Sequence, residues 1–116
     1  MSIKIYHNPR CSKSRNTLAL LEEQGLKVEI VKYLDTPPTK EELKELLLML
    51  GMSARELMRT KEEIYKELGL QEITDEEILI ESMVTHPKLI ERPIVIKENH
   101  AVIGRPIENV VKLLAQ

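Results

Sequence analysis

Apolar and polar residues alternate at the start of the chain and then change period. Residues 3–6 (Ile-Lys-Ile-Tyr) have the two-residue period of a β-strand, and residues 7–9 (His-Asn-Pro) are typical of a loop. A helical pattern begins at about Ser12, and Gly25 is placed to end that helix in a left-handed conformation. A second strand is predicted over about 27–32. Strand, helix, strand is the unit that forms a parallel pair with a right-handed crossover.

The middle segment, about 36–87, has a helical pattern throughout. Ser or Thr is followed three residues later by Glu in four potential capping boxes: Thr39/Glu42, Ser53/Glu56, Thr60/Glu63 and Thr74/Glu77. The leucine run 46–48, a stop at Gly51 and a turn at Gly69 support three or four helices, and Pro87 ends the last of them. The apolar face of that last helix is predicted to hold Ile78, Leu79 and Met83. No linker is visible, so we interpret this segment as a helical insertion that packs on the core.

The C-terminal segment returns to strand patterns. Residues 94–96 and 101–103 flank a polar connection and predict an antiparallel hairpin. Pro106 suits the first turn of a closing helix. Its predicted apolar positions are Ile107, Val110, Val111 and Leu114. The pattern as a whole predicts an α/β fold with a mixed sheet of about four strands and a helical insertion between strands 2 and 3.

Composition limits the class of protein. The 116 residues suffice for a single domain spanning 1–116, and 42% apolar with 31% charged residues suits a globular chain. A net charge of −2 offers no broad attraction for nucleic acid or an anionic membrane, so neither is expected as a partner. No apolar run is long enough to span a bilayer, and the N-terminus lacks a signal-peptide pattern. We therefore expect a cytoplasmic protein.

Cys11 is the only cysteine, and it lies where a loop passes into a helix. Free N–H groups and the helix dipole at that position stabilise a thiolate, which is the nucleophilic form of cysteine. Arg10, Lys13 and Arg15 add positive charge nearby, and His7 is close enough in sequence to reach the sulfur. These features predict a reactive thiol, against the alternative of a small buried apolar residue.

The surrounding residues restrict the chemistry of this thiol. A dithiol motif would need a second cysteine at the position of Ser14, so no internal disulfide can form. An external thiol must therefore release the oxidised or adducted Cys11. His7 and Cys11 alone do not complete a tetrahedral metal shell, and we expect neither a metal nor a bound cofactor.

Residues 7–17 (His-Asn-Pro-Arg-Cys-Ser-Lys-Ser-Arg-Asn-Thr) closely resemble the active-site segment of the glutaredoxin-dependent arsenate reductases, whose motif is His-x3-Cys-x3-Arg. The resemblance continues through most of the chain, in residues 33–38, 67–70, 86–87, 92–95 and 104–106. It implies a thioredoxin-like fold with a helical insertion, in agreement with the pattern of elements.

The resemblance also implies an activity and a set of site residues. Cys11, supported by His7, would attack arsenate or a similar small oxyanion, with glutathione and glutaredoxin as the external reductant. Arg59, Arg92 and Arg105 would bind the oxyanion, because guanidinium groups are permanently charged and bind oxyanions through paired donors. Ser14, Arg15 and Pro93 would support the site, and the Arg92-Pro93 bond would be cis. Without the resemblance, Arg55 and Arg59 could not be told apart.

Two other functions remain open at this point. A monothiol oxidoreductase acting on glutathione adducts would use the same thiol, with the arginines binding a carboxylate. The same fold family also includes a transcription regulator that binds RNA polymerase, but such regulators typically carry a two-cysteine switch. The leading prediction is an oxidoreductase, the glutaredoxin-type arsenate reductase.

Overall fold

The computed structural model describes residues 2–116, and the chain forms two compact units. The first extends to Thr36 and resumes at Arg92–Gln116, and the second is Pro37–Glu91. The first unit contains β1 (Ile3–Tyr6), α1 (Ser12–Glu23), β2 (Val28–Val31), β3 (Ile94–Lys97), β4 (His100–Ile103) and α6 (Glu108–Leu114). The second contains α2 (Lys40–Leu50), α3 (Ala54–Leu57), α4 (Glu63–Glu67), the 3-10 helix η1 (Leu70–Glu72), α5 (Glu76–Thr85) and the 3-10 helix η2 (Pro87–Leu89).

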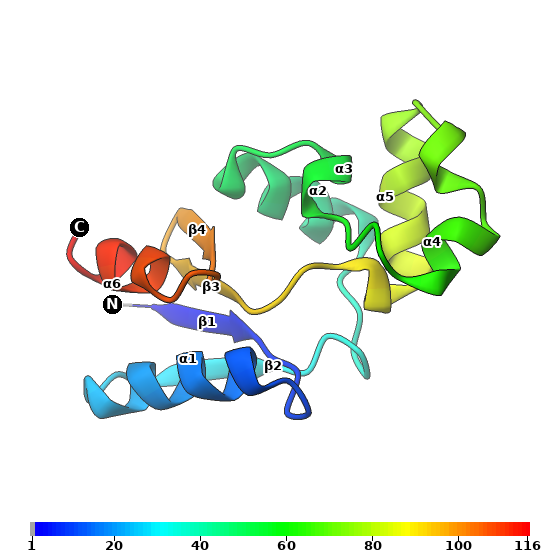
Figure 1. The fold of residues 1–116 in the computed structure, drawn as a ribbon. Helices are drawn as coiled ribbons and strands as arrows, with labels where there is room; N and C mark the ends of the chain where they lie inside the picture. The colour runs from blue at the N-terminus through cyan, green and yellow to red at the C-terminus, as the bar shows by residue number, and fades with distance from the viewer. Residues whose placement is uncertain (1) are drawn as a thin grey trace. The chain divides into compact units, whose positions relative to one another are not determined.

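The first unit is built on a four-stranded mixed sheet with the strand order β2-β1-β3-β4 (Figure 1). β1 pairs in parallel with β2, which confirms the predicted strand-helix-strand unit, and Ile5 lies opposite Ile30 in that pair. β3 runs antiparallel to both β1 and β4, which confirms the predicted hairpin. The predicted α/β class and number of strands are both confirmed.

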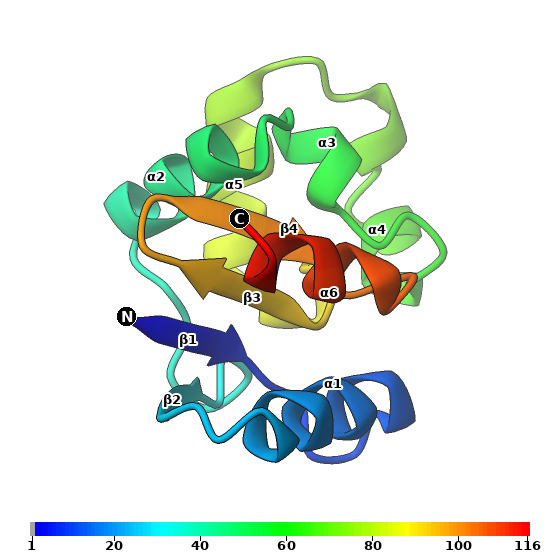
Figure 2. The same ribbon diagram turned by 90° about the vertical axis from the view of Figure 1, so that its left-hand side faces the viewer.

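One cluster of apolar side chains joins this sheet to its two helices. Alternate residues of the central strands, Ile3 and Ile5 from β1 and Val95 from β3, are fully or almost fully buried. Leu21 of α1 and two residues of α6 belong to the same cluster, so both helices pack on this face (Figure 2). Burial of this face fixes α1, and therefore the residue at its N-terminus, against the sheet.

The ends of α1 lie where the sequence predicts them. Cys11 is the N-cap residue with extended φ and ψ, and Ser12 is the first helical residue. Gly25 follows the C-cap with φ of +73°, a left-handed conformation that residues with a Cβ rarely adopt.

The closing helix begins later than predicted. Pro106 does not lie in the first turn, because Ile107 is the N-cap of α6 and Glu108 its first residue. Pro106 instead follows a cis peptide bond in the preceding turn. The buried face is Val110 and Leu113, and the predicted core position Val111 is 51% exposed. The i, i+3 pair 110 and 113 faces the sheet, which turns Val111 toward solvent.

The second unit contains two of the four predicted capping boxes. Thr39 and Ser53 are the N-caps of α2 and α3, and each exchanges hydrogen bonds with the Glu three residues later. The other two predictions are wrong. α4 begins after Glu62, so Thr60 lies ahead of the helix, and Asp75 caps α5 by accepting a hydrogen bond from Glu77 N. Asp is at least as good an N-cap as Thr, and it stands one residue closer to the helix.

Apolar positions in this unit were predicted only in part. Gly51 and Gly69 have positive φ and end their helical segments as expected. Leu79 and Met83 are buried in α5, but Ile78 is 43% exposed and Ile80 takes its place in the core. Leu48, the last of the leucine run, is 82% exposed. Within residues 2–116, no helix is both long and apolar enough to cross a membrane. The organisation as one domain with an insertion stays a prediction.

Candidate active site

The thiol of Cys11 lies at the start of α1 in the first unit. Its side chain is 8% exposed. Cys11 N donates to Asn8 O at 3.0 Å, and Arg15 N donates to Cys11 O at 3.0 Å, so hydrogen bonds on both sides hold its backbone. The thiol is therefore fixed in position where the backbone N–H groups of the first helical turn have no helical acceptor.

The surroundings of Cys11 favour its thiolate. Burial raises the pKa of the thiol, but this effect is outweighed by the Ser14 N–H, by the positive charge of Arg92 and by the Lys13 N–H. Arg92 also donates a side-chain hydrogen bond to the sulfur. The net result is a pKa below the ordinary value for cysteine, which increases the fraction of nucleophile at neutral pH.

Two distant arginines reach this thiol. Arg105 Nη2 lies 3.8 Å from Cys11 Sγ. Arg92 lies two residues before β3, and its peptide bond to Pro93 is cis, which confirms that prediction. Pro93 O accepts from Gly104 N at 2.9 Å, so the segments that carry Arg92 and Arg105 are bonded to each other. The structure thus brings together three of the predicted site residues from distant parts of the sequence.

Close packing at Gly104 holds the Arg105 segment against α1. A Cβ at this position would lie 2.9 Å from Pro93 Cγ and 3.1 Å from Thr17 Oγ1. Thr17 is fully buried and donates to Lys13 O at 3.0 Å. Neither Thr17 nor Gly104 was predicted from the sequence to be a positioning residue. The one local signal in the sequence was the Gly directly before a predicted site arginine, which indicates a close approach of the backbone.

His7 and Ser14 form a buried polar pair beneath the loop. His7 Nδ1 lies 2.7 Å from Ser14 Oγ, and the same hydroxyl accepts from Asn8 N at 3.0 Å. Burial lowers the pKa of His7 below its ordinary value, and the charges of Lys32 and Arg15 lower it further. His7 is therefore neutral at pH 7 and orders the loop through Ser14.

The cations next to Cys11 in the sequence contribute less than expected. Arg15 Nη1 donates to Pro9 O at 2.9 Å, which ties α1 to the loop. Arg10 N donates to Asn8 Oδ1, while its side chain is exposed. Lys13 acts on the thiol through its backbone N–H. Among the charged side chains, it is the distant Arg92 that lowers the pKa of Cys11.

Arg59 and Arg55 both lie in the second unit and have different partners. Arg59 forms ion pairs with Glu62 at 3.3 Å and with Glu91 at 3.9 Å. Arg55 hydrogen-bonds to Tyr65 Oη, Leu70 O and Ile73 O. Arg55 therefore joins α3 to the segment around η1 and has a structural role. The function of Arg59 as an anion-binding residue stays a prediction from the resemblance.

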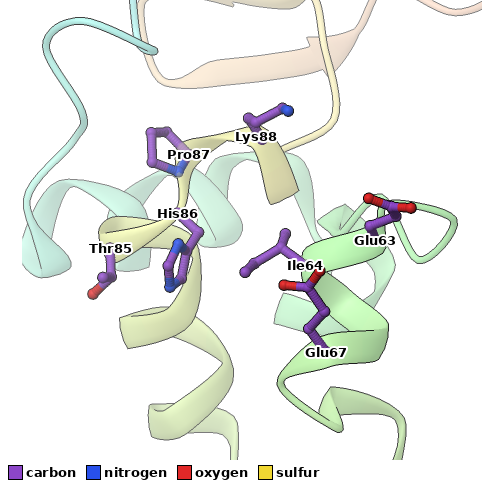
Figure 3. Close-up of a pocket in the computed structure, with 7 residues that line it drawn as sticks. All are labelled: Glu63, Ile64, Glu67, Thr85, His86, Pro87 and Lys88. Atoms are coloured by element: carbon purple, nitrogen blue, oxygen red, sulfur yellow. The ribbon is translucent and has the colours of Figure 1, made fainter.

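The second unit has a pocket of its own between α4 and the end of α5 (Figure 3). His86 lines it and faces Ile64 and Glu67. No set of three or more His, Cys, Asp or Glu side chains suited to a metal ion occurs in residues 2–116. This pocket contains no thiol.

Comparisons with known proteins agree with this geometry. The ArsC family model matches residues 6–113. The chain is 54% identical over 114 residues to an arsenate reductase of Neisseria meningitidis, with 97% of each chain covered. It is 46% identical to an arsenate reductase of Escherichia coli, covering 97% of this chain and 81% of that protein. The structure of an arsenate reductase from Vibrio cholerae matches with a TM-score of 0.93 at 54% identity, covering 97% of each chain.

These likenesses cover almost the whole chain and include the segments that carry Cys11, Arg92 and Arg105. The mixed sheet, its two packed helices and these relatives establish the predicted thioredoxin-like fold. The chain belongs to the ArsC family.

Proposed function

We propose that this protein is an arsenate reductase that uses Cys11 as its nucleophile. The observation that carries the proposal is the buried Cys11 thiol, which has a lowered pKa and contacts with Arg92 and Arg105. Relatives with 46% and 54% identity bear the name arsenate reductase, which supports arsenate as the substrate.

The first step forms a bond between Cys11 Sγ and arsenic, and one arsenate oxygen leaves as water. We assign the remaining oxygens to Arg92 and Arg105, because both contact the sulfur that becomes bonded to arsenic. We assign Arg59 to the same anion on the resemblance. Its pairs with Glu62 and Glu91 would then keep the guanidinium ordered until substrate binds.

External thiols supply the two electrons, since the chain has no second cysteine. A glutathione thiol displaces a second oxygen from arsenic as water. A thiol of glutaredoxin then attacks the glutathione sulfur, a disulfide forms, and the electron pair of the broken sulfur–arsenic bond reduces As(V) to As(III). Water hydrolyses the remaining bond to Cys11 and releases arsenite. A lone thiol used in this way suits a reducing compartment, and we place the reaction in the cytoplasm.

A coupled assay tests the proposal directly. Purified protein with glutathione, glutaredoxin, glutathione reductase and NADPH should consume NADPH only when arsenate is added. Cys11→Ser should abolish that consumption. If the full mixture consumes no NADPH with arsenate, while the protein without glutaredoxin supports NADPH consumption with a glutathione mixed disulfide, the protein is instead a monothiol oxidoreductase. Co-purification with RNA polymerase that persists in Cys11→Ser would favour the regulator.

A further inference from the structure

A hollow in the first unit lies beside the thiol. It is formed by the first turns of α1 and by the loop between β4 and α6, and its volume of about 380 Å³ is in the range of small-molecule pockets. Arg105 lines the hollow and also contacts Cys11 Sγ at 3.8 Å. A ligand bound in the hollow would therefore have its reactive end next to the site of chemistry.

Charged groups of both signs line this hollow. Lys13 of α1 and Glu108, the first residue of α6, both line it. In the part of the chain that the structure describes, residues 2–116, neither side chain has an ion-pair partner. Asn16, whose amide can both donate and accept, also lines the hollow.

This arrangement distinguishes between possible ligands. A bare oxyanion would gain from Lys13 and Arg105 but would be repelled by Glu108. A group that carries an ammonium and a carboxylate on one carbon could satisfy both side chains at once, and the Asn16 amide could bond to either charge. Glu108 therefore makes the hollow better suited to an amino-acid head group, whose ammonium it can pair with, than to arsenate.

We propose that this hollow binds the γ-glutamyl head group of glutathione, with its carboxylate at Lys13 and its ammonium at Glu108. The inference rests on the proposed function, which makes glutathione the thiol that reacts at arsenic. From the head group in the hollow, the rest of glutathione extends past Arg105 toward Cys11. The sulfur of its cysteine then reaches the arsenic bonded to Cys11. The chain thus selects its reductant with residues that do not bind arsenate.

A binding experiment tests this without turnover. S-methylglutathione cannot react with the adduct, and it is titrated into the wild-type protein by two-dimensional NMR. Amide shifts are expected at Asn16, Thr17, Gly104 and Glu108. Lys13→Ala and Glu108→Gln should each raise Kd about threefold to tenfold, and Lys112→Ala, an exposed cation of α6 away from the hollow, should not. S-methylcysteinylglycine, which lacks the γ-glutamyl group, should shift none of these amides.

Several outcomes would overturn the inference. Equal binding of the two peptides, shifts confined to other segments, or an unchanged Kd in both hollow variants would each do so. In the coupled assay, Glu108→Gln should raise the KM for glutathione about threefold to tenfold and leave the KM for arsenate unchanged. Equal changes in both KM values would contradict it. Absence of arsenate turnover in the wild type would sink the proposed function, while the titration would still decide whether the hollow binds glutathione.

Discussion

Arg105 Nη2 lies 3.8 Å from Cys11 Sγ, although 94 residues separate the two in the sequence. The contact depends on Gly104, whose missing side chain lets the Arg105 segment pack against Pro93 and Thr17. The guanidinium thus lies where negative charge is present in the thiolate and in its arsenate adduct.

Removing that guanidinium should impair catalysis. Arg105→Ala is expected to lower kcat/KM for arsenate about a hundredfold in the coupled assay, as loss of a charged donor does in other oxyanion sites. Arg10→Ala is the matched control, because its exposed side chain lies beside Cys11 in sequence only, and it should retain activity. Equal losses in the two variants would show that general positive charge, and not the contact with sulfur, is what matters.

The pKa of Cys11 should depend on Arg92. Its charge and its hydrogen bond both favour the thiolate, so Arg92→Gln should raise the pKa of Cys11. The pH dependence of alkylation by iodoacetamide measures this, and its midpoint should move to higher pH in the variant. Arg10→Gln should leave the midpoint where it is. A midpoint unmoved by Arg92→Gln would contradict the assigned role.

Stability should fall in mild acid because of His7. Burial and nearby cations lower its pKa in the folded protein, so the unfolded chain takes up the proton first as the pH drops below about 6.5. Unfolding in urea at pH 7.5 and 5.5 should show a smaller free energy of unfolding at the lower pH. His7→Gln should reduce this pH dependence. The exposed His100, replaced by Gln, should not change it.

Gly104 should tolerate no side chain. Gly104→Ala places a methyl group 2.9 Å from Pro93 Cγ and should destabilise the protein by about 1–3 kcal/mol. It should also alter the alkylation midpoint of Cys11, because the methyl group would displace Pro93 and with it the adjacent Arg92, whose charge lowers the pKa of Cys11. Gly51→Ala, where the added methyl meets no atom within 4 Å but φ is +68°, should cost about 1 kcal/mol and leave the midpoint unchanged. An unchanged midpoint in Gly104→Ala would count against this positioning role.

Substitution of Arg55 should mainly reduce stability, whereas substitution of Arg59 should mainly reduce activity. Arg55→Met removes hydrogen bonds to two backbone carbonyls and should destabilise the protein by about 2–3 kcal/mol. Arg59→Met breaks two partly exposed ion pairs and should cost less than about 1 kcal/mol, yet lower arsenate turnover about a hundredfold. Thermal unfolding and the coupled assay compare the two. Full activity in Arg59→Met would remove it from the proposed site.

The sequence by itself determined most of the elements and the thiol. Period-two and helical patterns, with Gly25, Gly51 and Gly69, placed the strands and most helix ends, since these signals are local. The position of Cys11 at a helix start and the absence of a second cysteine also needed no tertiary information. Resemblance of motifs then supplied the distant arginines.

Only the tertiary structure decided which groups act on the thiol. Arg10 and Arg15 are neighbours of Cys11 in sequence, yet Arg92 and Arg105 contact its sulfur, because the sheet brings the ends of β1, β3 and β4 together. Tertiary packing also decided which face of each helix is buried. Val111 and Ile78 fit an apolar pattern but face solvent, since the packing of each helix on its neighbours selects the buried face among several apolar candidates. A local pattern can predict that a helix forms, but it does not define the surface against which that helix packs.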